Sequence, residues 1–227
     1  MNKSAFRAAL KRSLPILCSY VFIGAAFGIT MSEAGYGWPL SALSSAIVYT
    51  GAFQFVLAAL LAASSPLGTI ALTALLMNSR QVFYSLTFID EFRRMGRRTP
   101  YMIASMTDET YAINCSLPID LENRHDVMFY LALLSQLYWI AGTLLGAIAG
   151  SVLPWDMTGI DFSMTALFVI IAIDQWQGAR DHLPAVGGAV IAVVCLLIFG
   201  GSSFMLPALL AVSAALMLRP AQKEEHA

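Results

Sequence analysis

The chain has 227 residues, of which 58% are hydrophobic and only 12% charged, and its formal net charge at pH 7 is −1. Ordinary globular domains carry about 25% charged residues, so this composition excludes a typical soluble domain. The near-neutral balance gives no indication of a nucleic-acid partner, and Cys18, Cys115 and Cys195 stand singly, which argues against a metal or redox centre.

Residues 1–13 are basic and precede a first apolar stretch, Leu14–Met31. A basic start followed by an apolar run also describes a secretory signal. Many further apolar segments follow, and no separate soluble domain is available for secretion, so we expect the stretch to be retained as the first transmembrane helix. The basic residues before it are expected to form a cytoplasmic or interfacial segment on the lipid surface.

Residues 14–218 are expected to form one transmembrane domain, because no linker or charge block is long enough to divide them, and residues 219–227 form a short polar tail. An α-helix needs roughly 20 apolar residues to cross the hydrocarbon core. The sequence therefore predicts an all-α, polytopic membrane bundle with about six to eight hydrophobic segments, some re-entrant or broken. The apolar segments are Leu14–Met31, Leu40–Ala63, Leu67–Ile89, Met102–Leu117, Val127–Leu153, Met164–Trp176, Leu183–Phe199 and Ser202–Leu218.

Positive charges flank the cytoplasmic ends of membrane spans, so the basic N-terminus and the arginine-rich loop at 93–98 belong on the same side. Three full membrane crossings between the N-terminus and this loop would place the two on opposite sides of the membrane. Leu40–Ala63 is the first candidate for a segment that does not cross, since Gly51 and Gln54 interrupt it halfway and a broken helix can return as a re-entrant pair. Met102–Leu117, which is short and contains two acids, is the second. Six crossings result if both are re-entrant and eight if neither is, and the sequence leaves this choice open.

Small residues recur every four positions in two of the segments. Gly24 and Gly28 share one face of the first segment, and Gly142, Gly146 and Gly150 share one face of the fifth. In lipid, such stripes let helix backbones approach closely. They predict tight helix contacts, within the chain or between subunits.

Arg80 is the only charged residue between Glu33 and Asp90. A guanidinium at the middle of a membrane helix costs about 2.5–3.5 kcal/mol on insertion scales, so a folded partner must offset that cost. At 100° per residue, Arg80 shares a face with Thr73, Tyr84 and Thr87, beside a polar arc of Asn78, Gln81 and Ser85. The width of this polar surface favours a solute-facing cavity over a single locking ion pair, which is the alternative.

The partners expected for Arg80 lie in the segment Thr107–Tyr111, which contains Asp108 and Glu109. Adjacent helical residues point about 100° apart, so we expect the two acids to have different roles. One can pair with Arg80 while the other binds a cationic group or a proton. Asp174, Gln175 and Gln177 close the sixth segment, where an interfacial carboxylate is expected.

Several of these residues, in this order and spacing, resemble the AzlC family, the large subunit of bacterial branched-chain amino acid exporters. The resemblance implies a multi-pass protein of the inner membrane. It further implies that this protein exports valine, leucine and isoleucine, with methionine as a further candidate. It also implies a separately encoded, small hydrophobic AzlD-type partner. The residues that carry it are Ser13-Leu14-Pro15-Ile16, Gly24, Phe27-Gly28, Gly51-Ala52, Gln54-Phe55, Asn78, Arg80, Tyr84 and Thr107-Asp108-Glu109.

One position departs from the family pattern. The family often has a histidine directly after the arginine, and this chain has Gln81 there. An imidazole proton relay is therefore not expected at this point. If coupling is protonic, Asp108 or Glu109 must carry it.

The leading hypothesis is a secondary transporter without a cofactor. Arg80 would hold the substrate carboxylate, Gln54, Asn78 and Tyr84 would complete the substrate site, and Asp108 or Glu109 would meet the α-ammonium or exchange a proton. A permease component of an ATP-driven transporter and a structural membrane subunit are the alternatives. An enzyme is not expected, because no H-E-x-x-H or G-x-S-x-G motif is present and the histidines lie outside the predicted spans.

Overall fold

The structure is a computed structural model that describes residues 3–118, 121–152, 169, 173, 176–177, 181–200 and 204–217. The side chains of Arg80, Met205, Leu206, Leu209, Leu216 and Met217 are outside this description. The chain divides into a first unit, Met1–Ser65 with Asn78–Ile160, and a second unit, Pro66–Met77 with Asp161–Ala227. Each unit is considered by itself.

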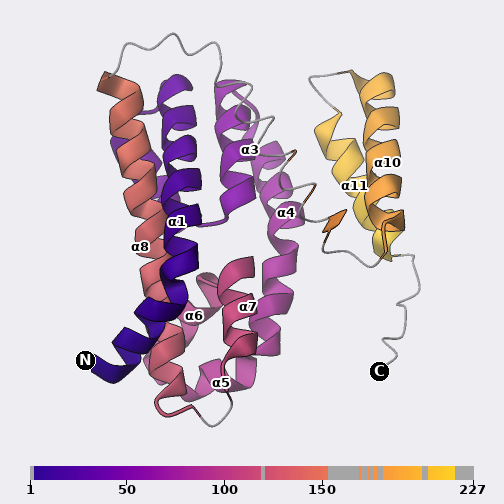
Figure 1. Cartoon of the computed structure of the whole chain (residues 1–227). Coiled ribbons are helices and arrows are strands. Elements are labelled where there is room, and N and C mark those ends of the chain that lie inside the picture. Colours follow the sequence, from indigo (N-terminus) through magenta and orange to yellow (C-terminus); the bar gives the residue numbers. More distant parts are fainter. Residues whose placement is uncertain are drawn as a thin grey trace. The chain divides into compact units, whose positions relative to one another are not determined.

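The secondary structure of the described residues is helical throughout, as the all-α prediction expects (Figure 1). Proline begins α2, α6 and α10 in the first helical turn, where its missing N–H costs nothing. The helices are α1 (Lys3–Glu33), α2 (Trp38–Ile47), α3 (Gly51–Ala62), α4 (Leu67–Thr87), α5 (Ile89–Arg94), the 3₁₀ turn η1 (Gly96–Arg98), α6 (Thr99–Ala104), α7 (Asp108–Ser116), α8 (Arg124–Val152), α10 (Leu183–Phe199) and α11 (Met205–Met217).

Helices α1 and α8 form a close parallel pair. Phe6 and Tyr130 make an edge-to-face contact near the starts of the two helices, with ring centroids 5.6 Å apart. A methyl group on Gly24 would lie 2.8 Å from the carbonyl oxygen of Trp139, and one on Gly142 would lie 2.6 Å from that of Val21. The predicted close contact of the glycine stripes is therefore confirmed, and it lies inside the chain. Among the described helices, α1 and α8 are the two long and apolar enough to cross a membrane.

Residues 3–13 continue the same helix as the first apolar segment, since α1 is unbroken from Lys3 to Glu33. Ala5, Ala9 and Ser13 are buried. The Ser13 hydroxyl lies 3.1 Å from that of Tyr138 on α8. The basic start of the chain is thus held against the beginning of α8.

The segment 40–63 is a helical hairpin with a break between α2 and α3. At the break, Tyr49 and Gly51 adopt positive φ values of 39° and 22°. The Gln136 side chain, near the middle of α8, donates to the Ala46 carbonyl at 3.0 Å, so α2 ends halfway along α8. Helix α3 then returns, because the Leu61 carbonyl accepts from the Tyr36 hydroxyl just beyond the end of α1, at 3.4 Å. The predicted break and return of this segment are confirmed.

The segment 102–117 is also broken, between α6 and α7. Its hairpin starts at the opposite end of the unit, where Arg98 forms an ion pair with Asp126 at 2.6 Å. Its tip reaches the middle of α1, where Thr107 lies 2.8 Å from the Tyr20 hydroxyl. It ends beside the start of α8, where Arg124 donates to the Leu117 carbonyl at 2.5 Å. The second predicted candidate is therefore a hairpin as well.

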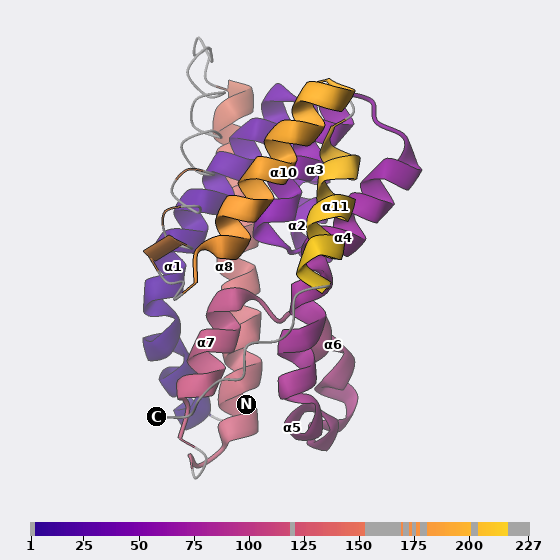
Figure 2. The same ribbon diagram turned by 90° about the vertical axis from the view of Figure 1, so that its right-hand side faces the viewer.

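The basic N-terminus and the loop at 93–98 lie at the same end of the first unit (Figures 1 and 2). The parallel packing of α1 and α8 and the ion pair of Arg124 with Glu91, at 3.0 Å, hold them there. This placement agrees with the positive-inside rule. The total of six to eight segments remains a prediction, because most of Met164–Trp176, with Asp174 and Gln175, and the tail 219–227 lie outside the described residues.

The C-terminal half of α4 is polar inside and apolar outside. Ser85 is buried and donates to the Ile103 carbonyl at 2.9 Å, whereas Val82, Phe83 and Leu86 are exposed. This distribution is the one expected for a helix that faces lipid. Thr87 departs from the predicted polar face: it is exposed and its hydroxyl bonds back to the Phe83 carbonyl.

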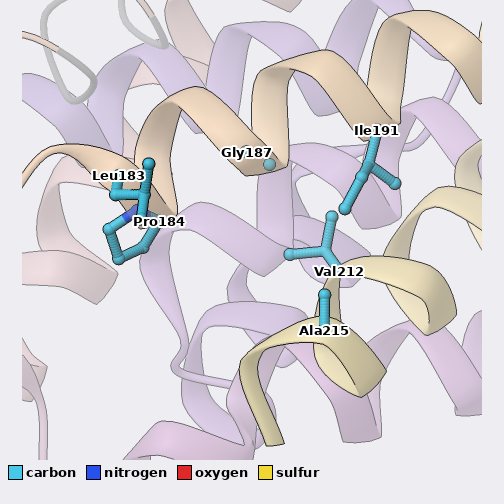
Figure 3. A pocket seen from close by; sticks show the side chains of 7 residues that line it. Leu183, Pro184, Gly187, Ile191, Val212 and Ala215 are labelled. Atoms are coloured by element: carbon cyan, nitrogen blue, oxygen red, sulfur yellow. The ribbon is translucent and has the colours of Figure 1, made fainter. Parts of the chain in front are cut away.

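In the second unit, α10 and α11 pack together around an apolar cleft of about 120 Å³ (Figure 3). Its lining includes Leu183, Pro184 and Ile191 of α10 and Val212 and Ala215 of α11. These side chains carry no hydrogen-bonding group. The cleft therefore lacks the polar contacts that would orient a charged solute.

Candidate functional site

The tips of the two hairpins meet halfway along α1 and α8. The Tyr20 hydroxyl lies 2.8 Å from Thr107 Oγ1 and 2.5 Å from a carboxylate oxygen of Glu109, both at the tip of the α6–α7 hairpin. The Tyr20 ring makes an edge-to-face contact with Trp139 of α8, with centroids 5.4 Å apart. From the other hairpin, Gly51 lies against the same Trp139 ring, since a methyl group on Gly51 would meet Trp139 Cη2 at 3.9 Å. Both breaks therefore lie in one layer.

The α2–α3 break leaves the N-terminus of α3 uncapped. Thr50 occupies the N-cap position, but its side chain caps no backbone N–H. Phe53 donates to the Thr50 carbonyl at 2.8 Å, whereas the N–H groups of Gly51 and Ala52 have no acceptor among the described residues. The first N–H groups of a helix require partners from outside the helix. This half-buried helix end therefore has donors without an acceptor among the described residues.

The α6–α7 break differs from the first, because the N-terminus of α7 is capped. Thr107 and Thr110 form a reciprocal capping box at the start of α7, with the Thr107 side chain accepting from the Thr110 N–H at 3.4 Å and the Thr110 hydroxyl accepting from the Thr107 N–H at 2.9 Å. Asp108 and Glu109 follow in the first turn, where the positive end of the helix dipole stabilises carboxylates. The N-terminus of α7 is therefore satisfied by its own residues.

Buried polar atoms without partners gather around these breaks. Gln54 is fully buried, and its Nε2 donates to the Ser44 and Ser45 hydroxyls at 3.3 Å each, whereas its Oε1 has no partner among the described residues. Most buried polar groups in proteins are hydrogen-bonded, so each exception calls for an explanation. Further atoms of this kind in the first unit are Tyr49 Oη, Thr50 Oγ1, Ser105 Oγ, Asn114 Oδ1, Ser135 Oγ and Trp139 Nε1.

The position of Arg80 on α4 follows from its neighbours. Tyr84 stacks on Tyr111 of α7, with ring centroids 4.7 Å apart and planes 26° from parallel. Both helices run toward the end that holds α5, Arg80 lies about one turn before Tyr84, and Asp108 lies about one turn before Tyr111. The backbones of Arg80 and Asp108 are therefore at a similar level, while the Arg80 side chain lies outside the described residues.

The predicted site residues fall on both hairpins and on α4. Gln54 stands at the first break, and Asp108 and Glu109 stand at the second. Asn78 and Tyr84 lie half-buried on α4. Asp108 is half-buried, whereas Glu109 is exposed despite its bond to Tyr20. Tyr84 of α4 thus lies against the α6–α7 hairpin, which carries both acids. Gln54 instead contacts α2.

The family model described as AzlC protein matches residues 15–153. This chain belongs to the AzlC family. It is 36% identical over 235 residues to the branched-chain amino acid transport protein AzlC of Bacillus subtilis, covering 99% of this chain and 92% of that protein. It is 38% identical over 221 residues to an uncharacterized membrane protein of Helicobacter pylori, covering 97% of each. It is 32% identical over 184 residues to the inner membrane protein YgaZ of Escherichia coli, covering 78% of this chain and 75% of that one.

No solved structure gives a significant match. The region matched to AzlC extends from the first part of α1 to the end of α8, so it contains both hairpins and α4. The layer in which the hairpin tips meet therefore lies entirely within the AzlC region.

The sequence reasoning missed Tyr20, Thr50 and Trp139. A usable signal was present for two of them. Tyr20 lies four residues before Gly24, and Trp139 lies three residues before Gly142, so each shares the face of an AzlC glycine stripe. That face was assigned to packing alone. Thr50 carried no such signal, because the break that exposes it has no clear marker at that residue.

Proposed function

We propose that this chain is the large subunit of a secondary transporter that exports branched-chain amino acids across the bacterial inner membrane. The substrates are valine, leucine and isoleucine, with methionine as a further candidate. A small hydrophobic AzlD-type membrane protein is the expected partner, and neither a cofactor nor a catalytic step is involved. The similarity to a protein named as a branched-chain amino acid transport protein supports the substrate class.

The observation that carries the proposal is the meeting of two broken-helix hairpins at mid-depth. In a membrane, interrupted helices are tolerated where the freed backbone is buried in protein or lines a cavity. Secondary transporters commonly place their substrate and ion sites at such breaks near the bilayer midplane. Here the break before Gly51 reaches the Trp139 ring, and the break at Thr107 reaches Tyr20, which contacts the same ring. Movement of either hairpin would open the shared layer toward one side only.

The charged groups have complementary roles in this proposal. Arg80 on α4 would hold the substrate carboxylate, and Asn78 and Tyr84 on the same helix would help to place it. Asp108 or Glu109 would meet the α-ammonium or carry a coupling proton. Glu109 is the better placed for proton exchange, since it is exposed and bonded to Tyr20 at the hairpin tip. The side chain of Gln54 would contribute from the opposite hairpin.

The branched side chain would lie against aromatic rings in the same layer. Phe27 contacts Phe55 of α3 and Trp139 of α8, with ring centroids 5.6 and 6.5 Å apart. Burial of each methylene contributes about 0.8 kcal/mol. Discrimination by one methylene in such a pocket is worth only about 1–3 kcal/mol, so the preference among valine, leucine and isoleucine should be shallow.

Efflux from proteoliposomes tests this function. The complex would be reconstituted with and without the small partner, and vesicles preloaded with radiolabelled leucine, valine or isoleucine would be followed with and without a pH gradient. Efflux that responds to the gradient is expected, and Arg80→Ala should abolish it without preventing assembly. ATP-dependent efflux would point to a permease component instead, and a loss of assembly in Arg80→Ala would point to a structural role.

A further inference from the structure

We infer that the substrate carboxylate is held at the N-terminus of α3, by the backbone N–H groups of Gly51 and Ala52 and the indole N–H of Trp139. The α-ammonium is then held by unpaired side-chain oxygens beside the same helix end. This inference rests on the proposed function and deepens it, because it assigns the recognition of the amino acid's two charges to the α2–α3 hairpin.

The N-terminus of α3 has the properties of an anion site. A helix carries roughly half a positive charge at its N-terminus, and the N–H groups there point toward an anion. Helix α3 has 12 residues, its N-cap Thr50 makes no capping bond, and Gly51 and Ala52 donate to no acceptor among the described residues. Gly51 also has no side chain to cover its own N–H. A carboxylate at this point would satisfy donors that the protein leaves unpaired.

The ring of Trp139 contacts that helix end, and its buried indole N–H is a further donor. The residue is only 3% exposed, and its Nε1 has no acceptor among the described residues. Its ring lies against the first residue of α3, since a methyl group on Gly51 would meet Trp139 Cη2 at 3.9 Å. A buried indole N–H usually has a partner, because leaving it unpaired costs free energy. A substrate carboxylate would provide that partner.

Acceptors for the ammonium group stand around the same break. Oε1 of Gln54 and Oγ1 of Thr50 are buried and have no donor among the described residues. Helix α2 also directs its C-terminal end, which carries partial negative charge, toward the break. Backbone donors at the start of α3 and the side-chain oxygens of Gln54 and Thr50 beside them thus match the two charged groups of an α-amino acid.

Arg80 and the α3 terminus are compatible partners for one carboxylate. A carboxylate has two oxygens with about four acceptor positions, and a guanidinium uses at most two of them. The remaining positions require further donors, which Gly51, Ala52 and Trp139 can supply. The N-terminus of α7 is unsuitable for this purpose, because Thr107 caps it and Asp108 and Glu109 would repel an anion there.

Binding of leucine and two analogues to the purified complex tests the inference. The analogue 4-methylpentanoate keeps the carboxylate without the ammonium, and 3-methylbutylamine keeps the ammonium without the carboxylate. Trp139→Phe keeps an aromatic ring but removes the donor. It should weaken leucine and 4-methylpentanoate binding by roughly tenfold or more, since a hydrogen bond to a charged group is lost, and leave 3-methylbutylamine unchanged.

Two controls separate the donor from the ring. Trp38→Phe removes an indole N–H at the other end of the α2–α3 hairpin, where Trp38 is 54% exposed, and should change nothing. A β-(3-benzothienyl)alanine at position 139 replaces the N–H by sulfur at nearly constant shape and should reproduce the loss. The inference is overturned if all three ligands weaken equally in Trp139→Phe, or if that variant binds leucine like the wild type. Failure of the assembled wild-type complex to bind leucine would instead remove the proposed function, and the inference with it.

Discussion

Tyr20 on α1 and Glu109 on α7 are joined by a hydrogen bond of 2.5 Å, which ties the tip of the second hairpin to the long α1–α8 pair. Thr107, next to the tip, contacts the same hydroxyl at 2.8 Å. The α6–α7 hairpin also contacts α8 through Tyr101, whose hydroxyl donates to Gln136 Oε1 at 2.8 Å, and at its base, where Arg124 donates to the Leu117 carbonyl. The Tyr20 hydroxyl is therefore placed to control whether the tip stays in the central layer.

Tyr20→Phe should release the hairpin tip while leaving the ring contact with Trp139 in place. A hydrogen bond to a charged acceptor is worth roughly 1.5–3 kcal/mol, and about 1 kcal/mol is expected here because Glu109 is exposed. That energy corresponds to about a fivefold change in a two-state equilibrium. Leucine efflux from proteoliposomes should change by about this factor, and its dependence on the pH gradient should weaken.

Tyr138→Phe is the matched control for this change. It removes a hydroxyl that joins α1 to α8, through Ser13 at 3.1 Å, and that makes no hydrogen bond to either hairpin tip among the described residues. A small loss of thermal stability without a change in efflux is expected. Equal effects of the two variants on efflux would show that the Tyr20 hydroxyl acts through packing of the long helices.

The glycine contacts between α1 and α8 make a prediction about stability. Gly28→Ala would place a methyl group against the Thr143 carbonyl and the Ala147 N–H, which are backbone atoms and cannot turn aside. Overpacking of this kind costs typically about 1–3 kcal/mol, so the apparent unfolding temperature in detergent should fall clearly. Gly68→Ala, where nothing lies within 4 Å of the added methyl group, should leave it nearly unchanged. A tolerated Gly28→Ala would mean that the helices are farther apart than described.

The arrangement of the first unit could be predicted in outline from the sequence. Gly51 and Gln54 in the middle of an apolar segment, together with the conflict in the positive-inside rule, pointed to a broken helix that returns. The break itself lies at residues 48–50, before either marker. Tyr49 has a φ of 39°, a conformation that is costly for a residue with a side chain, and only the surrounding packing can impose it.

The site was harder to predict than the fold. Sequence periodicity finds charged residues in apolar helices, and it selected Arg80, Asp108 and Glu109 for that reason. Trp139 is apolar by most scales, and its proposed role comes from an indole N–H that has no acceptor among the described residues. Free backbone donors, such as those of Gly51 and Ala52, have no sequence signature of their own, because every residue except proline carries one.

The topology of the hairpins predicts which residues a membrane-impermeant reagent can reach. In a cysteine-free background, Lys11→Cys, Ala63→Cys and Arg97→Cys would be labelled with a maleimide in intact cells and in inverted vesicles. With a returning α2–α3 pair, we expect labelling of Ala63→Cys from the outer side and of both basic positions from the inner side. A full crossing by Leu40–Ala63 would reverse the labelling of both Ala63→Cys and Arg97→Cys, so the two arrangements give opposite patterns.

Substitutions of Gln54 test whether its side chain binds the ammonium or the carboxylate of the substrate. Its Nε2 is engaged by Ser44 and Ser45, which leaves Oε1 for a donor on the substrate. Gln54→Glu preserves an oxygen at this place, and the two serine hydroxyls can donate to the other oxygen. The bound ammonium would offset the buried negative charge, so leucine affinity should be kept or increased.

Gln54→Leu removes the acceptor at similar volume and should weaken leucine binding by about tenfold, since a hydrogen bond to a charged group is worth about 1.5–3 kcal/mol. Both variants would be compared as assembled complexes, by equilibrium binding of radiolabelled leucine. If Gln54→Glu instead loses binding while Gln54→Leu retains it, the side chain faces the carboxylate. The orientation of the amino acid across the α2–α3 break would then have to be reversed.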